Sequence, residues 1–256
     1  MLLLSLIACN NEKAEDNTTA DTLSLEKQLT NEIAKYPDSL LLKENLINYY
    51  TDSGDYKNAL KIVDGAIYTD SMNPRLWNIK ANLHFRDEDT TNAIRSLETA
   101  VKIFPVHQYM ISLGRLYAQT GNSLALTIAD TLSLMDKEKA GKEINYIKGL
   151  YYSFNNDKVT AISYFDKCLA ANFTFMEAYV EKSIALYDLG KYTEALEVLD
   201  KALTLQNNFD EGYYYSGKCL EKLNRIPEAI QSYQNALQID PDYVEAKEAL
   251  ERLGGS

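Results

Sequence analysis

Small and apolar residues recur along this chain at a fixed interval. A first column of small residues consists of Ala59, Ala93, Ala161, Ala195 and Ala229. A second column, further along each interval, consists of Ala66, Ala100, Cys168, Ala202 and Ala236. Successive members of each column are separated by the same interval. The exception lies between the second and third members, where the interval doubles because one repeat lacks both small residues. Around them apolar residues fall at i, i+1, i+4, i+7 and i+8, which is the spacing of one face of an α-helix. The pattern predicts an amphipathic helix with a period of about 34 residues.

Turn-forming residues divide each interval into two helices. Ser53-Gly54-Asp55 and Leu189-Gly190-Lys191 fall inside repeats, and Asn73-Pro74 and Asp240-Pro241 fall between them. Such a period is typical of helical hairpins that bury their apolar faces only against neighbouring hairpins. We therefore expect an all-α fold, with a single solenoid over residues 22–253. Its predicted parts are an N-terminal helix at 22–39, repeats at 40–73, 74–106, 107–141, 142–175, 176–209 and 210–243, and a polar capping helix at 244–253, followed by a tail at 254–256.

The repeats resemble those of the tetratricopeptide repeat family, whose pattern runs aromatic, Leu-Gly, Tyr, Ala, aromatic, Ala and Pro. In the repeat at 210–243 the matching residues are Tyr213, Gly217, Ala229, Tyr233, Ala236 and Pro241. The third repeat departs from the pattern, because Leu126 and Ser133 stand where the two small residues belong. The resemblance implies a right-handed superhelical solenoid of stacked helix-turn-helix hairpins, and an activity of binding proteins or peptides.

Composition narrows the class of partner. The formal net charge is −11, and no run of Lys or Arg interleaved with aromatic residues occurs, which disfavours nucleic acid as a ligand. Known hydrolase, metalloprotease and nucleotide-binding motifs are absent from the sequence. The sequence has two histidines and no Cys-x-x-Cys spacing, so it offers few residues that could form a zinc or redox site. We therefore expect no enzyme activity, no cofactor and no metal, and we expect Cys168 and Cys219 to pack in the core without forming a disulfide.

The first residues indicate a membrane anchor. An apolar run ends at Leu6-Ile7-Ala8-Cys9, which resembles a bacterial lipobox, where cleavage leaves a lipid-modified cysteine at the N-terminus. A secretory signal has a positive segment and a longer apolar run, so residues 1–9 are interpreted as the end of a truncated signal. The alternative is a buried apolar stub with a free thiol. Residues 10–21 lack large apolar side chains and are expected to form a disordered acidic tether. No run of about 20 apolar residues occurs, so we expect membrane attachment through the lipid alone.

The resemblance also places a binding groove along the first helices of the repeats. Its N-terminal half is expected to be polar and its C-terminal half apolar with an acidic border, which suits an amphipathic helix or an extended segment. The predicted contact residues are Asn48, Asn82, Arg86, Arg115, Tyr146, Leu150, Phe154, Ile184, Tyr187, Tyr214 and Lys218. Relatives that clamp acidic chaperone tails need a lysine where this chain has Glu44, so that clamp is absent.

These features favour one hypothesis about function and leave alternatives open. The favoured hypothesis is a non-enzymatic adaptor that binds a protein or peptide partner and is lipid-anchored through Cys9 to the outer membrane of a bacterial cell envelope. Both a periplasmic and a surface-facing orientation remain open. The alternative is a permanent structural subunit of an envelope machine for secretion, motility or nutrient uptake. A glycan-uptake lipoprotein is a third, weaker hypothesis, because such relatives carry a large additional region.

Overall fold

The computed structural model describes residues 18–254, with the side chains of 25–135 and 141–254. Every regular element in this part of the chain is a helix, which confirms the all-α prediction. The chain divides into two compact units, one ending at Asp89 and the other beginning at Thr90. The first unit contains α1 (Thr18–Lys35), α2 (Leu40–Asp52), α3 (Tyr56–Thr69) and α4 (Pro74–Arg86). The second contains α5 (Thr90–Ile103), α6 (His107–Gln119), α7 (Leu124–Phe154), α8 (Lys158–Ala171), α9 (Met176–Asp188), α10 (Tyr192–Leu205), α11 (Asp210–Lys222), α12 (Ile226–Ile239) and α13 (Val244–Leu253).

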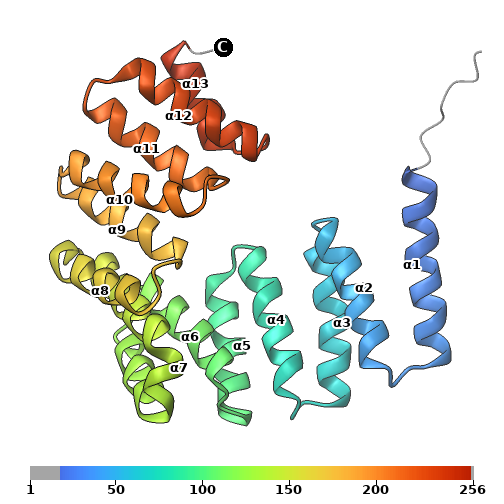
Figure 1. Cartoon of the computed structure of the whole chain (residues 1–256). Helices are drawn as coiled ribbons and strands as arrows, with labels where there is room; N and C mark the ends of the chain where they lie inside the picture. Colours follow the sequence, from blue (N-terminus) through green and yellow to red (C-terminus); the bar gives the residue numbers. More distant parts are fainter. Residues whose placement is uncertain (1–17, 255–256) are drawn as a thin grey trace, which may run out of the picture. The chain divides into compact units, whose positions relative to one another are not determined.

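Within each unit, consecutive helices run in opposite directions and pack as hairpins (Figure 1). The turn that follows the first helix of each repeat contains one residue in the left-handed backbone region. These residues are Gly54, Glu88, Gly121, Asn156, Gly190 and Asn224. They recur at the interval of the small residues, to within a single position, so the sequence period is repeated in the backbone. Glycine and asparagine adopt this region more easily than other residues, which explains why they occupy all of these turns except the one at Glu88.

The two columns of small residues form the contacts between helices. All ten are buried, with at most 4% of their surface exposed. In the third repeat the sequence alignment was wrong by one residue, because Leu126 and Ser133 are only half-buried. The fully buried residues there are Ala125, Ala129 and Leu132. The third repeat therefore retains a small residue, Ala125, one position earlier than predicted, whereas the second position is filled by Leu132.

Helix α7 is not a single straight helix. The Lys148 amine lies 2.7 Å from the Asp130 carboxylate, although 18 residues of straight helix span about 27 Å. The chain must therefore reverse direction between Asp130 and Lys148, an interval that contains the predicted repeat boundary at 141. The same Lys–Asp pairing joins a second helix to the next first helix elsewhere, at Lys80–Asp64 and Lys182–Asp166. The two halves of α7 thus pack against each other in the same way as α3 packs against α4 and α8 against α9.

The ends of the array differ in part from the predictions. Helix α1 begins at Thr18, so residues 18–21 of the predicted disordered tether are helical. The capping helix has the predicted bounds, Val244–Leu253. Residues 1–17, including Cys9, lie outside the described residues. No helix in the described residues is long and apolar enough to cross a membrane.

Candidate functional site

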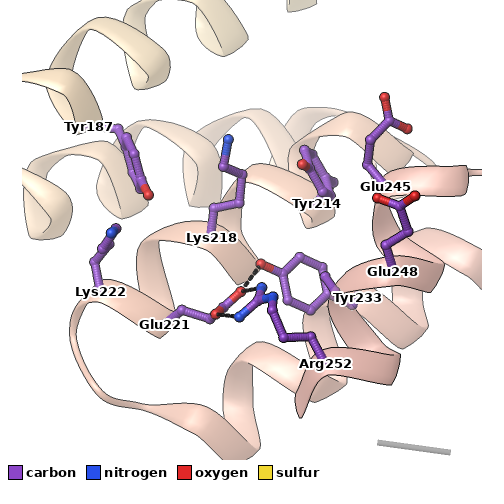
Figure 2. A pocket seen from close by; sticks show the side chains of 10 residues that line it. Tyr187, Tyr214, Lys218, Glu221, Lys222, Tyr233, Glu245, Glu248 and Arg252 are labelled. Atoms are coloured by element: carbon purple, nitrogen blue, oxygen red, sulfur yellow. Dashed lines mark hydrogen bonds and ion pairs between the residues drawn. The ribbon is translucent and has the colours of Figure 1, made fainter. Parts of the chain in front are cut away.

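Near the C-terminus, α9, α11, α12 and α13 surround a pocket of about 540 Å³ (Figure 2). This volume falls within the range of ligand-binding clefts in proteins. The lining combines aromatic rings with both signs of charge. Its residues are Tyr187, Tyr214, Lys218, Glu221, Lys222, Tyr233, Glu245, Glu248, Ala249 and Arg252. We call this the C-terminal pocket.

Helix geometry brings three predicted contact residues together in this pocket. Tyr214 and Lys218 are four residues apart on α11 and so share one face of the helix. Tyr187, in the last turn of α9, reaches the same place because α9 packs against α11. The Lys218 amine lies 5.3 Å from the ring centre of Tyr187, 5.6 Å from that of Tyr214 and 5.2 Å from that of Tyr215. Each contact is of cation–π type, so the rings hold the lysine side chain in position.

An ion pair fixes the floor of the pocket. Both terminal nitrogens of Arg252 on α13 donate to the carboxylate of Glu221 on α11, at 2.6 and 2.7 Å. The Tyr233 hydroxyl on α12 donates to the same carboxylate at 2.6 Å. The hydrogen bond from Arg252 is the main reason why the pKa of Glu221 lies below its ordinary value. Charge-assisted, forked hydrogen bonds of this kind constrain geometry as well as add energy, so three helices are tied together at one point.

Two other predicted contact residues are buried. Tyr146 is 6% exposed and Leu150 is fully buried, so the prediction that both lie open in a groove was wrong. The Arg115 guanidinium lies 4.8 Å above the ring of Tyr146, and Phe175 packs edge-on against it at 5.1 Å. A position count along the repeat could not show this, because the covering side chains come from α6 and from the loop before α9. Leu150 is enclosed because α6, α8 and α9 all contact α7.

The remaining predicted residues do not join the C-terminal pocket. Ile184 packs beside the buried cluster formed by Tyr179, Val180, Ala202 and Phe209. Phe154 is 55% exposed at the end of α7.

In the first unit, Asn48, Asn82 and Arg86 are exposed. Asn48 lines a shallow hollow of about 590 Å³ between α1 and α2, together with Leu25, Leu29, Asn45, Tyr49, Asp52 and Ser53. Glu44, at the position where chaperone-binding relatives carry lysine, receives two hydrogen bonds of 2.7 Å from Arg75. Some of the polar groups on the surface of the first unit therefore already form hydrogen bonds with each other.

Sequence reasoning identified Lys218 but missed the other charged residues around the pocket. Lys222 stands at the thirteenth position of the last repeat, which faces the groove in this family, so its spacing from Lys218 was a usable signal. Glu245, Glu248 and Arg252 were interpreted as solvated residues of a capping helix. Their contribution to the lining follows from α13 packing against α12, which closes the pocket.

An acidic residue deeper in the second unit has an unusual environment. Burial raises the pKa of Glu181 on α9 to about 7, with Glu211 raising it further and Lys158 opposing the shift. Burial raises the pKa values of the Tyr146 and Tyr215 hydroxyls, and the nearby charge of Glu181 raises both further. Glu181 thus belongs to the predicted acidic border, but desolvation favours its neutral form.

The two cysteines of the second unit are buried and unpaired, as predicted. Burial raises the pKa of the Cys168 thiol to about 12 and that of Cys219 to about 11, so neither forms a reactive thiolate near neutral pH. Among the described residues, no group of His, Cys, Asp and Glu side chains has the arrangement of a metal site.

Comparisons with solved structures agree with this architecture. A tetratricopeptide repeat protein from Parabacteroides merdae is 18% identical, with a TM-score of 0.77 over 92% of this chain and 93% of that one. PilW, a type IV pilus biogenesis factor, is 19% identical, with a TM-score of 0.63 over 82% of this chain and 97% of its own. A thermophilic TPR protein from Thermus thermophilus is 16% identical, with a TM-score of 0.61 over 70% of this chain and 98% of its own. Identities this low show the fold alone.

Family models identify the repeats in the sequence itself. One tetratricopeptide repeat model matches residues 180–244, and another matches residues 74–107 and 142–175. No curated protein matches the sequence. Since the matched segments together cover slightly more than half of the sequence, and the fold agrees throughout, the chain belongs to the tetratricopeptide repeat family.

Proposed function

We propose that this protein is a non-enzymatic adaptor that binds a segment of a partner protein in the C-terminal pocket. The observation that carries the proposal is the convergence of Tyr187, Tyr214 and Lys218 on one pocket of about 540 Å³. Both tyrosines are half-buried, so their rings are held in place but keep an accessible surface. Tyrosine rings bury a large area at a small cost in side-chain entropy, which suits them to anchor a partner.

The proposal includes attachment to a bacterial envelope. It rests on the sequence at Leu6-Ile7-Ala8-Cys9 and on the acidic, polar residues that follow. A lipid on Cys9 would hold the repeats at the outer membrane while the pocket faces the aqueous phase. The pilus biogenesis role in the description of PilW belongs to that protein, and we assign no process to this chain.

Replacing the pocket tyrosines should weaken partner binding. The double variant Tyr187→Ala/Tyr214→Ala is expected to lose at least tenfold in affinity, or about 1.4 kcal/mol, because both half-buried rings line the pocket and can anchor the partner. The partner is first captured from cross-linked envelopes with the wild-type protein, and its affinity is then measured by surface plasmon resonance.

Tyr68 supplies the matched control, since it is 94% exposed in the first unit. Tyr68→Ala should bind as the wild type does. If the double variant retains wild-type affinity, the pocket is not the binding site. If the partner instead co-fractionates in fixed stoichiometry and resists moderate salt, the protein is a structural subunit rather than an adaptor.

Replacing Cys9 should release the protein from the membrane. We expect Cys9→Ser to abolish incorporation of labelled palmitate and to leave the protein in the soluble fraction or with its signal uncleaved. The measurement is fractionation of cells expressing each form from the native translation start. A wild-type protein that takes up no fatty acid and fractionates as soluble would rule out the anchor while leaving the pocket proposal intact.

A further inference from the structure

The C-terminal pocket carries opposite charges at its two ends. Figure 2 shows Lys218 and Lys222 beside Tyr187, and Glu245 and Glu248 beyond Tyr214. The charges that act on the pKa values of the two tyrosine hydroxyls agree with this placement. Burial raises the pKa values of both hydroxyls, but Lys222 counteracts the shift at Tyr187, whereas Glu245 and Glu248 increase it at Tyr214. One end of the pocket is therefore basic and the other acidic.

The basic end has no ion-paired carboxylate among the described residues. In the part of the chain that the structure describes, neither Lys218 nor Lys222 forms an ion pair with a carboxylate. Glu221 is the carboxylate next to them on α11, and it is already bound by Arg252 and Tyr233. Lys218 has three aromatic rings around its amine instead, so it can pair with a carboxylate brought by a ligand without giving up an ion pair to the described residues.

The acidic end is similarly available. Glu245 and Glu248 are exposed and lie three residues apart on α13, so both point to the same side of that helix. Neither forms an ion pair within the described residues. The Arg252–Glu221 pair ties α13 to α11, which fixes the distance between the two charged ends.

We propose that the C-terminal pocket recognises an internal segment of the partner in which an acidic and a basic side chain flank an apolar residue. The acidic side chain pairs with Lys218 and Lys222, the basic one pairs with Glu245 and Glu248, and the apolar residue packs against Tyr187 and Tyr214. This inference rests on the proposed function. An acidic C-terminal tail is a poorer ligand, because its other carboxylates would meet Glu245 and Glu248.

Panning a random dodecapeptide library, displayed as internal segments, against the full chain tests the inference. We expect enriched peptides to contain an acidic and a basic residue on either side of an apolar one. Charge reversal at one end should then change only one position of that pattern. Lys218→Glu/Lys222→Glu should select a basic residue in place of the acidic one, and Glu245→Lys/Glu248→Lys should select an acidic residue in place of the basic one. Each reversal should weaken the best wild-type peptide at least tenfold.

Two controls keep the result interpretable. Lys201→Glu and Glu197→Lys make the same charge changes on exposed positions of α10, outside the pocket, and should leave the selected pattern unchanged. Lys218→Met removes one of the two charges but retains an unbranched side chain, so it should weaken the acidic preference even if the double reversal fails to fold.

The failures of the two proposals are distinguishable. Enriched peptides that bind through the tyrosines but show no charge preference, or that end in acidic C-termini, would overturn the inference and retain the pocket. Enrichment that is insensitive to the tyrosine and charge variants, or no enrichment at all, would overturn the proposed function and the inference with it.

Discussion

Gly149→Ala should destabilise the protein by about 2 kcal/mol, although alanine is the better helix former by about 1 kcal/mol. A methyl group at this position would lie 2.5 Å from Cε1 and 2.7 Å from Cδ1 of Phe165. Phe165 is fully buried in the core. The glycine therefore permits α7 and α8 to approach closely, and the clash outweighs the gain in helix propensity.

Gly65→Ala provides the matched comparison. Gly65 is exposed on α3, and a methyl group there would meet nothing within 4 Å. We expect it to stabilise the first unit by about 1 kcal/mol, so the two substitutions should differ by about 3 kcal/mol and in sign. Urea unfolding followed by circular dichroism reports both, and the single tryptophan, Trp77, reports the unit that contains Gly65. Equal effects of the two substitutions would show that helix propensity, not the close approach, governs Gly149.

Glu181→Gln should stabilise the protein by about 3 kcal/mol at pH 8 and by much less at pH 5. The pKa of Glu181 is raised from 4.5 in the unfolded chain to about 7 in the fold. Below 4.5 the carboxyl is protonated in both states, and its burial carries no charge penalty. Between 4.5 and 7 the unfolded chain ionises first, so stability falls as the pH rises, and above 7 the full penalty is present.

The measurement is the free energy of unfolding in urea at pH 5 and pH 8. Glu197→Gln, on the exposed surface of α10, is the control and should change neither value. The charged groups that act on Glu181, Lys158 and Glu211, are unchanged in the variant. An equal effect of Glu181→Gln at both pH values would show that the carboxyl is ionised in the fold across this range.

The helical fold was predictable because its determinants are local. Ala59 and its counterparts recur at a fixed period, since every hairpin makes the same contact with its neighbour. The third repeat shows the limit of this reasoning. Ala125 lies 32 residues after Ala93 and 36 residues before Ala161, so a fixed period does not locate it, although the later repeats are back in register. The chain reversal inside α7 contains no proline, so the sequence indicated it only through the repeat boundary at 141, and the Asp130–Lys148 contact shows it.

The binding site was predictable only in part, because burial depends on side chains that are distant in sequence. Tyr187, Tyr214 and Lys218 were found from their positions in the repeat, and they line one pocket. Tyr146 has the same kind of position but is covered by Arg115 and Phe175. The acidic end of the pocket was missed because α13 lies outside the repeat pattern, although Arg252 fixes it to α11.

The central claim is that the partner lies in the C-terminal pocket, and photo-cross-linking in living cells tests it most directly. A benzoylphenylalanine residue is introduced in place of Tyr187, inside the pocket, or in place of Glu197, on the exposed surface of α10. We predict a cross-linked partner from position 187 and none from position 197, with the product at 187 lost when Tyr214 is also replaced by alanine. Cross-linking from position 197 alone, or from neither position, would contradict the account.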